Sequence, residues 1–111
     1  NNMNMLIGGH SESHSLMTKL SSQKAEEEIK KSKKFLKTIS SKNFVFCYPY
    51  GGKSSYNKSI INILKKYKFD FSVSVESRDI TNDDISKNKY TLPRYNCNKF
   101  PHGKAFKNKF N

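Results

Sequence analysis

Four short apolar segments punctuate this chain, and longer amphipathic segments separate them. The apolar segments are residues 5–8, 44–46, 69–75 and 90–95. Each has the length of a short strand, and an uninterrupted apolar run such as residues 44–46 is typical of a strand covered on both faces. In residues 69–75 apolar and polar positions alternate. This indicates one solvent-facing side, although in a barrel the small residues of a strand can instead point inward.

Two amphipathic helices are expected between these strands. The first is predicted from Ser21 or Ser22, a good N-cap, to residue 38 or 39, with an apolar stripe at helical spacing. Glutamates near its amino end and lysines toward its carboxyl end suit the helix dipole. The second is predicted from residue 54 or 55 to 66, and the polar residues 77–90 predict a loop. This alternation predicts an α/β domain with a parallel sheet and right-handed crossovers.

Length and charge narrow the picture further. A chain of 111 residues forms one small domain, whereas a complete (β/α) barrel needs roughly 200 residues or more. We expect a domain over residues 1–103 and a poorly ordered Lys/Asn-rich tail over 104–111. The net charge is +12, but nearly all positive charges are lysines, so compositional bias is the simpler interpretation and a polyanion partner the alternative. No apolar stretch is long enough to span a membrane.

The two cysteines, Cys47 and Cys97, lack the Cys-x-x-Cys spacing of a metal site. We expect them to be free, partly buried thiols, although one bridge between them would be arithmetically possible.

Two histidines four residues apart, His10 and His14, follow the first expected strand. Imidazole is a common metal ligand, and on one helical turn both rings could face the same ion. Two histidines at this spacing, without other ligands nearby, are more often solvated surface residues. Ser11 stands where the zinc-protease motif H-E-x-x-H carries its general base, so that motif is excluded.

A second cluster, Tyr48-Pro49-Tyr50-Gly51, lies about one βα unit further along. Together, His10-Ser11-x-x-His14 and this cluster resemble the second and third motifs of the polysaccharide deacetylases. These are the NodB-homology enzymes of carbohydrate esterase family 4. Leu92-Pro93-Arg94 resembles a stretch near the end of the barrel in several members. The resemblance covers roughly residues 5 to 95.

The resemblance implies a partial (β/α) barrel of the NodB type, with parallel strands alternating with helices and with the N-terminal strand and first motif absent. It implies metal-assisted hydrolysis of an N-acetyl group on a sugar or polysaccharide. His10 and His14 would bind Zn²⁺ or another divalent metal, and the backbone amide of Tyr50 would help to hold the oxyanion. Ser11 or Ser13 would hold a ligand ring through a hydrogen bond.

Other residues carry open alternatives. Arg94 is a candidate to orient a catalytic aspartate, whereas a surface ion pair with Asp79 or Asp83 is the plainer interpretation. Tyr48 and Tyr50 are equally suited to be core aromatics beside a turn. Asp70 is a minor candidate for pointing into the site, and the pair Asp83-Asp84 is expected to be solvated.

The departures from the family pattern limit what the chain is expected to do alone. The first motif, with its consecutive aspartates for base and third ligand, has no counterpart upstream of His10. Cys47 replaces the third-motif arginine, tryptophan is absent, and His102 matches the fifth motif poorly. We expect a fragment, natural truncation being the alternative, that binds zinc weakly and hydrolyses little. A non-catalytic basic module, binding a polyanion or carbohydrate, is the alternative function. Oligomeric state and localisation stay open.

Overall fold

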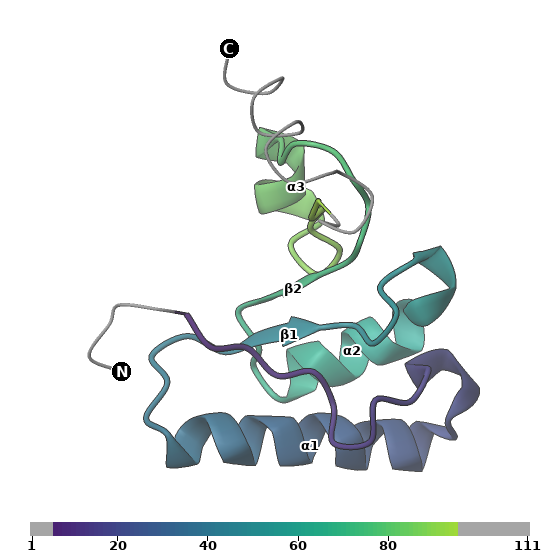
Figure 1. The fold of residues 1–111 in the computed structure, drawn as a ribbon, viewed down its shortest axis with the longest axis vertical. Helices are drawn as coiled ribbons and strands as arrows, with labels where there is room; N and C mark the ends of the chain where they lie inside the picture. Colours follow the sequence, from purple (N-terminus) through teal and green to yellow (C-terminus); the bar gives the residue numbers. More distant parts are fainter. Residues whose placement is uncertain (1–5, 96–111) are drawn as a thin grey trace, which may run out of the picture.

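The computed structural model describes residues 6–95, which form an α/β fold in which a small sheet lies between helices (Figure 1). Two 3-10 turns accompany the helices and strands. In chain order the elements are η1 (Met17–Lys19), α1 (Ser22–Thr38), β1 (Val45–Cys47), η2 (Lys53–Ser55), α2 (Lys58–Lys66), β2 (Phe71–Val73) and α3 (Asn82–Lys87).

The sheet is parallel, as expected, and its segments follow the order of the chain. β1 pairs with β2 in the register Val45 opposite Phe71. Gly9 makes a parallel bridge to one edge of β1, and Leu92 makes a parallel bridge to the far edge of β2. Four segments therefore lie side by side with their carboxyl ends at one edge of the sheet.

The two outer segments are bridges rather than the strands that we expected over residues 5–8 and 90–95. At the first, only Gly9 pairs, through hydrogen bonds of 2.7 Å with the main chain of Val45 and of Cys47. Leu6 and Ile7 are 55% and 42% exposed, so the expectation of a buried strand there was wrong for the described residues. No described element covers these two side chains, and a strand gains stability mainly from such packing.

Helix α1 confirms the expected bounds and apolar stripe. Ser21 caps it by accepting a hydrogen bond from the amide of Lys24 at 3.2 Å. Ala25, Ile29 and Leu36 are fully buried against α2 and against Phe46 of β1. The lysines of its outer face are exposed, as expected for a solvated surface: Lys30, Lys34 and Lys37.

Helix α2 begins later than expected, at Lys58 rather than at residue 54 or 55. The side chain of Asn57 accepts a hydrogen bond from the amide of Ile60 at 2.9 Å, which sets the start of the helix. The preceding serines form the separate turn η2 instead. Ile60 and Leu64 are buried, as the apolar pattern predicted.

The alternating pattern of residues 69–75 places its small polar side chains inside. Ser72 and Ser74 are buried, whereas the apolar residues between them are only partly covered. The hydroxyls of Ser72 and Tyr48 both donate to the carbonyl of Tyr90, at 2.6 and 2.7 Å. Burial raises the pKa of the Tyr48 hydroxyl, which stays protonated as a donor. The polar side of the alternation is therefore not the solvent-facing side, because Ser72 lies beside Phe46 on the face of the sheet that packs against the core.

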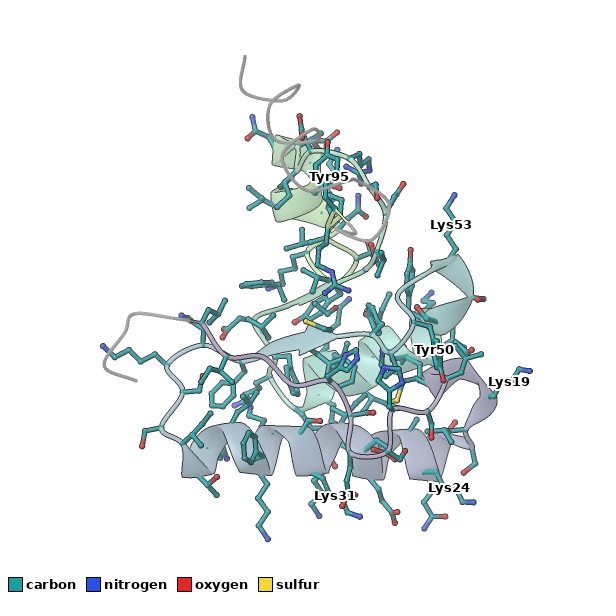
Figure 2. The ribbon with its side chains drawn as sticks, viewed as in Figure 1. Lys19, Lys24, Lys31, Tyr50, Lys53 and Tyr95 are labelled. Carbon is teal, nitrogen blue, oxygen red and sulfur yellow. The ribbon has the colours of Figure 1, made fainter. Side chains whose placement is uncertain are left out.

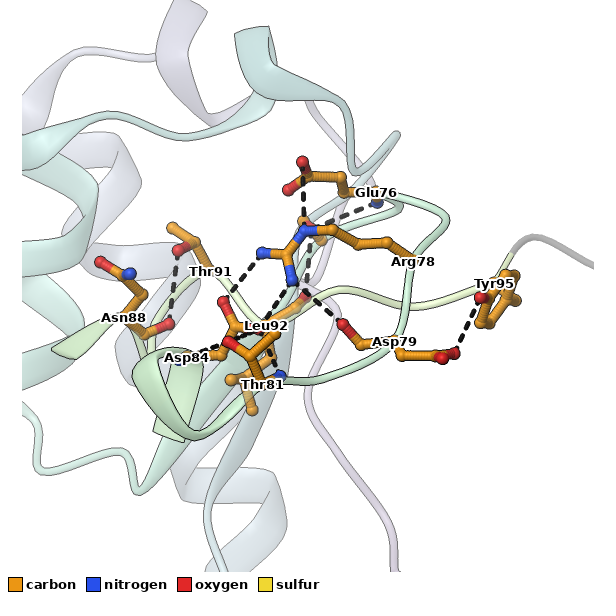
Figure 3. Close-up of polar contacts among 10 residues, drawn as sticks. Glu76, Arg78, Asp79, Thr81, Asp84, Asn88, Thr91, Leu92 and Tyr95 are labelled. Carbon is orange, nitrogen blue, oxygen red and sulfur yellow. Dashed lines mark hydrogen bonds and ion pairs between the residues drawn. The ribbon is translucent and has the colours of Figure 1, made fainter. Parts of the chain in front are cut away.

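The segment expected to be a loop over residues 77–90 contains helix α3, which lies beyond β2 on the side away from α1 (Figure 1). Thr81 and Asp84 form a reciprocal capping box, a signal that the polar composition masked. Arg78 donates two hydrogen bonds to the Asp84 carboxylate, at 2.7 and 2.8 Å (Figure 3). Asp84 is only 3% exposed, so the expectation of a solvated pair was wrong for this residue. Asp83 is exposed, as expected.

The Asp84 contacts predict a pH-dependent stability. The hydrogen bonds from Arg78 and Thr81 hold the pKa of the Asp84 carboxyl well below its usual range. Its contribution is therefore present above the pKa of the unfolded chain and is lost as pH falls through the lowered value. We expect Asp84→Asn to be less stable than the wild type at neutral pH, with a difference that shrinks in acid. Urea unfolding over a pH series measures this.

The exposed neighbour provides the control for this experiment. Asp83→Asn removes a negative charge from the same helical turn but leaves the Arg78 contacts intact. It should follow the wild type at every pH. Equal effects of the two substitutions would contradict the role given to Asp84.

Candidate functional site

The candidate site lies at the carboxyl edge of the sheet, where α/β proteins commonly place ligands. The loop with both histidines follows Gly9, and Tyr50 follows β1. The ring centroids of His10 and His14 are 4.7 Å apart, and those of His14 and Tyr50 are 4.9 Å apart. Tyr50 is labelled in Figure 2, between the loop that precedes α1 and the turn η2. The structure thus brings together three of the four residues expected in the site.

The histidines are not on a helical turn, in contrast to the geometry that their spacing suggested. Residues 10–16 are irregular, and Ser11 and His14 have positive φ angles of 64° and 56°. Left-handed residues interrupt a right-handed helix. The two rings meet because the loop folds back on itself, with the His14 amide donating to Ser11 Oγ at 2.9 Å.

The ring of His10 is held by the end of β1. Its Nδ1 lies 2.8 Å from the carbonyl oxygen of Cys47. Because a carbonyl only accepts hydrogen bonds, Nδ1 carries the proton and the lone pair of Nε2 faces away from the strand. Metal-binding imidazoles commonly make such a contact through their second nitrogen. The expected ring-holding role of Ser11 or Ser13 falls here to a backbone carbonyl.

A carboxylate from α1 holds the middle of the histidine loop. Glu28 Oε2 accepts hydrogen bonds from the amides of Glu12 and Ser13, at 2.6 and 3.2 Å. Its Oε1 accepts from the Ser13 hydroxyl at 2.5 Å. Burial raises the pKa of Glu28, but these hydrogen bonds lower it more, so that the net shift is downward. From the sequence alone, Glu28 is one of the glutamates that suit the helix dipole, because contacts across 15 residues leave no local signal.

The two tyrosines of the second cluster have different roles. Tyr48 is fully buried and belongs to the core. Tyr50 is 66% exposed and has a positive φ of 71°. Among the described residues, no acceptor receives a hydrogen bond from the Tyr50 amide. A free, fixed amide is the kind of donor that an oxyanion needs.

Gly51 fixes the turn that carries this amide. Its φ is +79°, and its carbonyl accepts a hydrogen bond from the amide of Val75 at 2.8 Å. A Cβ atom at Gly51 would lie 1.9 Å from Cγ2 of Val75. The close approach of two backbones at this point therefore requires glycine.

Arg94 and Asp70 lie outside the histidine cluster. Arg94 Nε donates to the carbonyl of Ser74 at 3.3 Å, and its charge acts on the Cys47 thiol. Burial raises the pKa of that thiol, and Arg94 offsets part of the rise. Asp70 is at the opposite edge of the sheet, where its carboxylate accepts from the amide of Phe44 at 2.7 Å. The idea that Asp70 points into the site was wrong.

The donor set fits part of a metal site. Two imidazoles with adjacent rings suit two positions of a zinc coordination sphere. Within residues 6–95, however, no three His, Cys, Asp or Glu side chains form a group that could hold a metal. Cys47 is a free thiol, and Cys97, His102 and the tail over 104–111 lie outside the described residues. Over the same described range, no helix is long and apolar enough to cross a membrane.

Comparison with protein-family models matches residues 1–72 to the family described as polysaccharide deacetylase. The match covers well over half of the chain and includes both histidines and Tyr50. No curated protein and no solved structure matches the chain significantly.

The turn at Gly51 yields a stability prediction. Gly51→Ala adds a methyl group that collides with Val75 and demands a left-handed alanine, so it should lower the free energy of unfolding by at least about 2 kcal/mol. Chemical denaturation measures the change. Gly52→Ala is the matched control, since nothing lies within 4 Å of its Cβ position. It should change stability by less than about 0.5 kcal/mol. Equal losses at both glycines would contradict the role of Gly51.

Proposed function

The chain belongs to the polysaccharide deacetylase family, and we propose that it carries part of the site for metal-dependent removal of N-acetyl groups from a sugar or polysaccharide. Family membership indicates a hydrolase of amide bonds in acetylated carbohydrate. The observation that carries the finer proposal is the oriented ring of His10 beside His14. Its Nδ1 is bound to the Cys47 carbonyl, which leaves Nε2 for an ion.

In the proposed mechanism, His10 and His14 hold Zn²⁺ or another divalent ion. When bound, this ion would polarise the acetyl carbonyl and lower the pKa of a water molecule. The Tyr50 amide, which has no acceptor among the described residues, donates a hydrogen bond to the developing oxyanion. The Cys47 carbonyl keeps the His10 ring in one orientation and one tautomer.

The role of Arg94 follows from its neighbour. The family pattern has an arginine where this chain has Cys47, and the charge of Arg94 acts on the Cys47 thiol. We infer that Arg94 supplies the positive charge that the third motif normally carries. In that position Arg94 would orient a catalytic aspartate. No such aspartate joins the histidine pair within residues 6–95.

For the fold, we propose that the four parallel segments are consecutive strands of the family's (β/α) barrel. Their order across the sheet equals their order along the chain, with a helix after each of the first three segments. A barrel requires this succession, whereas a doubly wound sheet reverses its order at the ligand site.

Zinc binding tests the ligand assignment. Two neutral histidines give weak binding, and loss of either should lower the affinity at least tenfold, or by about 1.4 kcal/mol. Calorimetric titration of the wild type, His10→Ala and His14→Ala with zinc measures this. His102→Ala is the control for non-specific binding of zinc to a histidine side chain. The assignment would be refuted if His10→Ala and His14→Ala bound zinc as tightly as the wild type. An equal loss of zinc affinity in His102→Ala would also refute it.

Acetate release from oligomers of N-acetylglucosamine tests the reaction. The 111-residue chain should release little acetate, because residues 6–95 place no carboxylate or other third ligand beside the histidine pair that could act as the base. Fusion of a strand that ends in two consecutive aspartates ahead of Asn1 should produce zinc-dependent release. The same fusion with His10→Ala, or with both aspartates changed to asparagine, is the inactive control. Tight zinc binding by the fusion without any acetate release would favour a binding module over a hydrolase.

A further inference from the structure

We propose that Glu28 of α1 is a positioning residue that shapes the histidine loop so that both rings reach one ion. The proposal rests on the function given above and adds to it a residue outside both motifs. Glu28 holds neither ring directly. It acts on the main chain between them, through the amides of Glu12 and Ser13 and through the Ser13 hydroxyl.

The histidine loop needs these hydrogen bonds because its backbone conformation is energetically unfavourable. Ser11 and His14 both adopt left-handed φ angles, which are unfavourable for a residue other than glycine. These two residues flank the pair that Glu28 binds. Three hydrogen bonds to one carboxylate, each with a charged acceptor, offset this conformational cost.

Helix α1 holds the backbone of Glu28 in a fixed position. Ile29, the next residue, is fully buried in the core. Ser32 lies one turn further along the helix and is close to the start of the loop, since a Cβ at Gly9 would be 2.9 Å from the Ser32 Cβ. Residues four apart share a helix face. The same face of α1 therefore contacts both the entry and the middle of the histidine loop.

The ion pair between Lys31 and Glu12 also contacts the loop, but it stabilises the loop less than Glu28 does. Lys31 pairs with Glu12 at 2.8 Å, but both side chains are largely exposed, and such pairs contribute little. Among the described residues, the side chain of Ser11 accepts a hydrogen bond only from within the loop, from the His14 amide. Glu28 is thus the contact that joins the middle of the loop to the core.

The decisive variants are Glu28→Ala and Glu28→Gln, with Glu27→Ala as the matched control. Glu27 is an exposed glutamate in the same helix turn. Glu28→Ala removes every acceptor, whereas the glutamine oxygen still accepts from the two amides. Ser13→Ala is the second variant should Glu28→Ala fail to fold. It leaves both amide contacts of Glu28 and removes the Oε1 contact, together with the hydrogen bond between the Ser13 and Ser15 hydroxyls.

The first measurement uses the metal-free protein. We expect Glu28→Ala to lose hydrogen-exchange protection at the Glu12 and Ser13 amides and the nuclear Overhauser effects between the two histidine rings. Glu28→Gln should retain most of both, and Glu27→Ala all of both. Ring proximity and protected amides in Glu28→Ala would overturn the proposal.

The second measurement is the zinc affinity, compared with the melting temperature. Glu28→Ala should weaken zinc binding at least tenfold, as loss of an outer contact to a metal ligand typically does, and Glu28→Gln should largely restore it. A parallel fall in melting temperature with unchanged zinc affinity would show a purely structural role and refute the proposal. If the wild type binds no zinc, the proposed function fails. The metal-free measurement then decides the role of Glu28 by itself.

Discussion

Parallel pairing of β1 with its neighbours is the constraint on which the rest of the structure depends. It puts the carboxyl ends of successive segments at one edge, so that loops distant in the chain meet there. Cys47 shows the connection most directly. Its amide donates to Gly9 and closes the pairing, and its carbonyl accepts from the ring of His10 and orients it. The last residue of the strand is therefore also a contact of the site.

The sheet is short, and buried hydroxyl groups donate hydrogen bonds to backbone carbonyls that strand pairing leaves without a partner. The carbonyl of Tyr90 accepts hydrogen bonds from Ser72 and Tyr48, and the Tyr90 hydroxyl donates to the carbonyl of Phe69 at 2.7 Å. Unpaired polar groups in a core cost free energy, so these contacts attach residues 90–92 to the sheet without a full strand. The described side chains contain no buried polar atom without a partner.

The sequence predicted those features that depend on local chemistry. Helix α1 was predicted within its observed limits because Ser21 caps it and its stripe is regular, and the two central strands because apolar runs are short and bounded. Helix α3 was missed because polar residues dominate it, although Thr81 and Asp84 carried the capping signal. The histidine pair was found, but its loop conformation was not. The contacts of Cys47 and Glu28 with that loop join residues far apart in the chain, which spacing and periodicity do not reveal.

The contact between His10 and the Cys47 carbonyl has a consequence for how this site tolerates change. A main-chain oxygen is present whatever side chain the residue bears. Position 47 can therefore carry different side chains while the imidazole of His10 keeps its orientation. The orientation of the His10 ring thus depends on the pairing of the strand and not on the side chain at position 47.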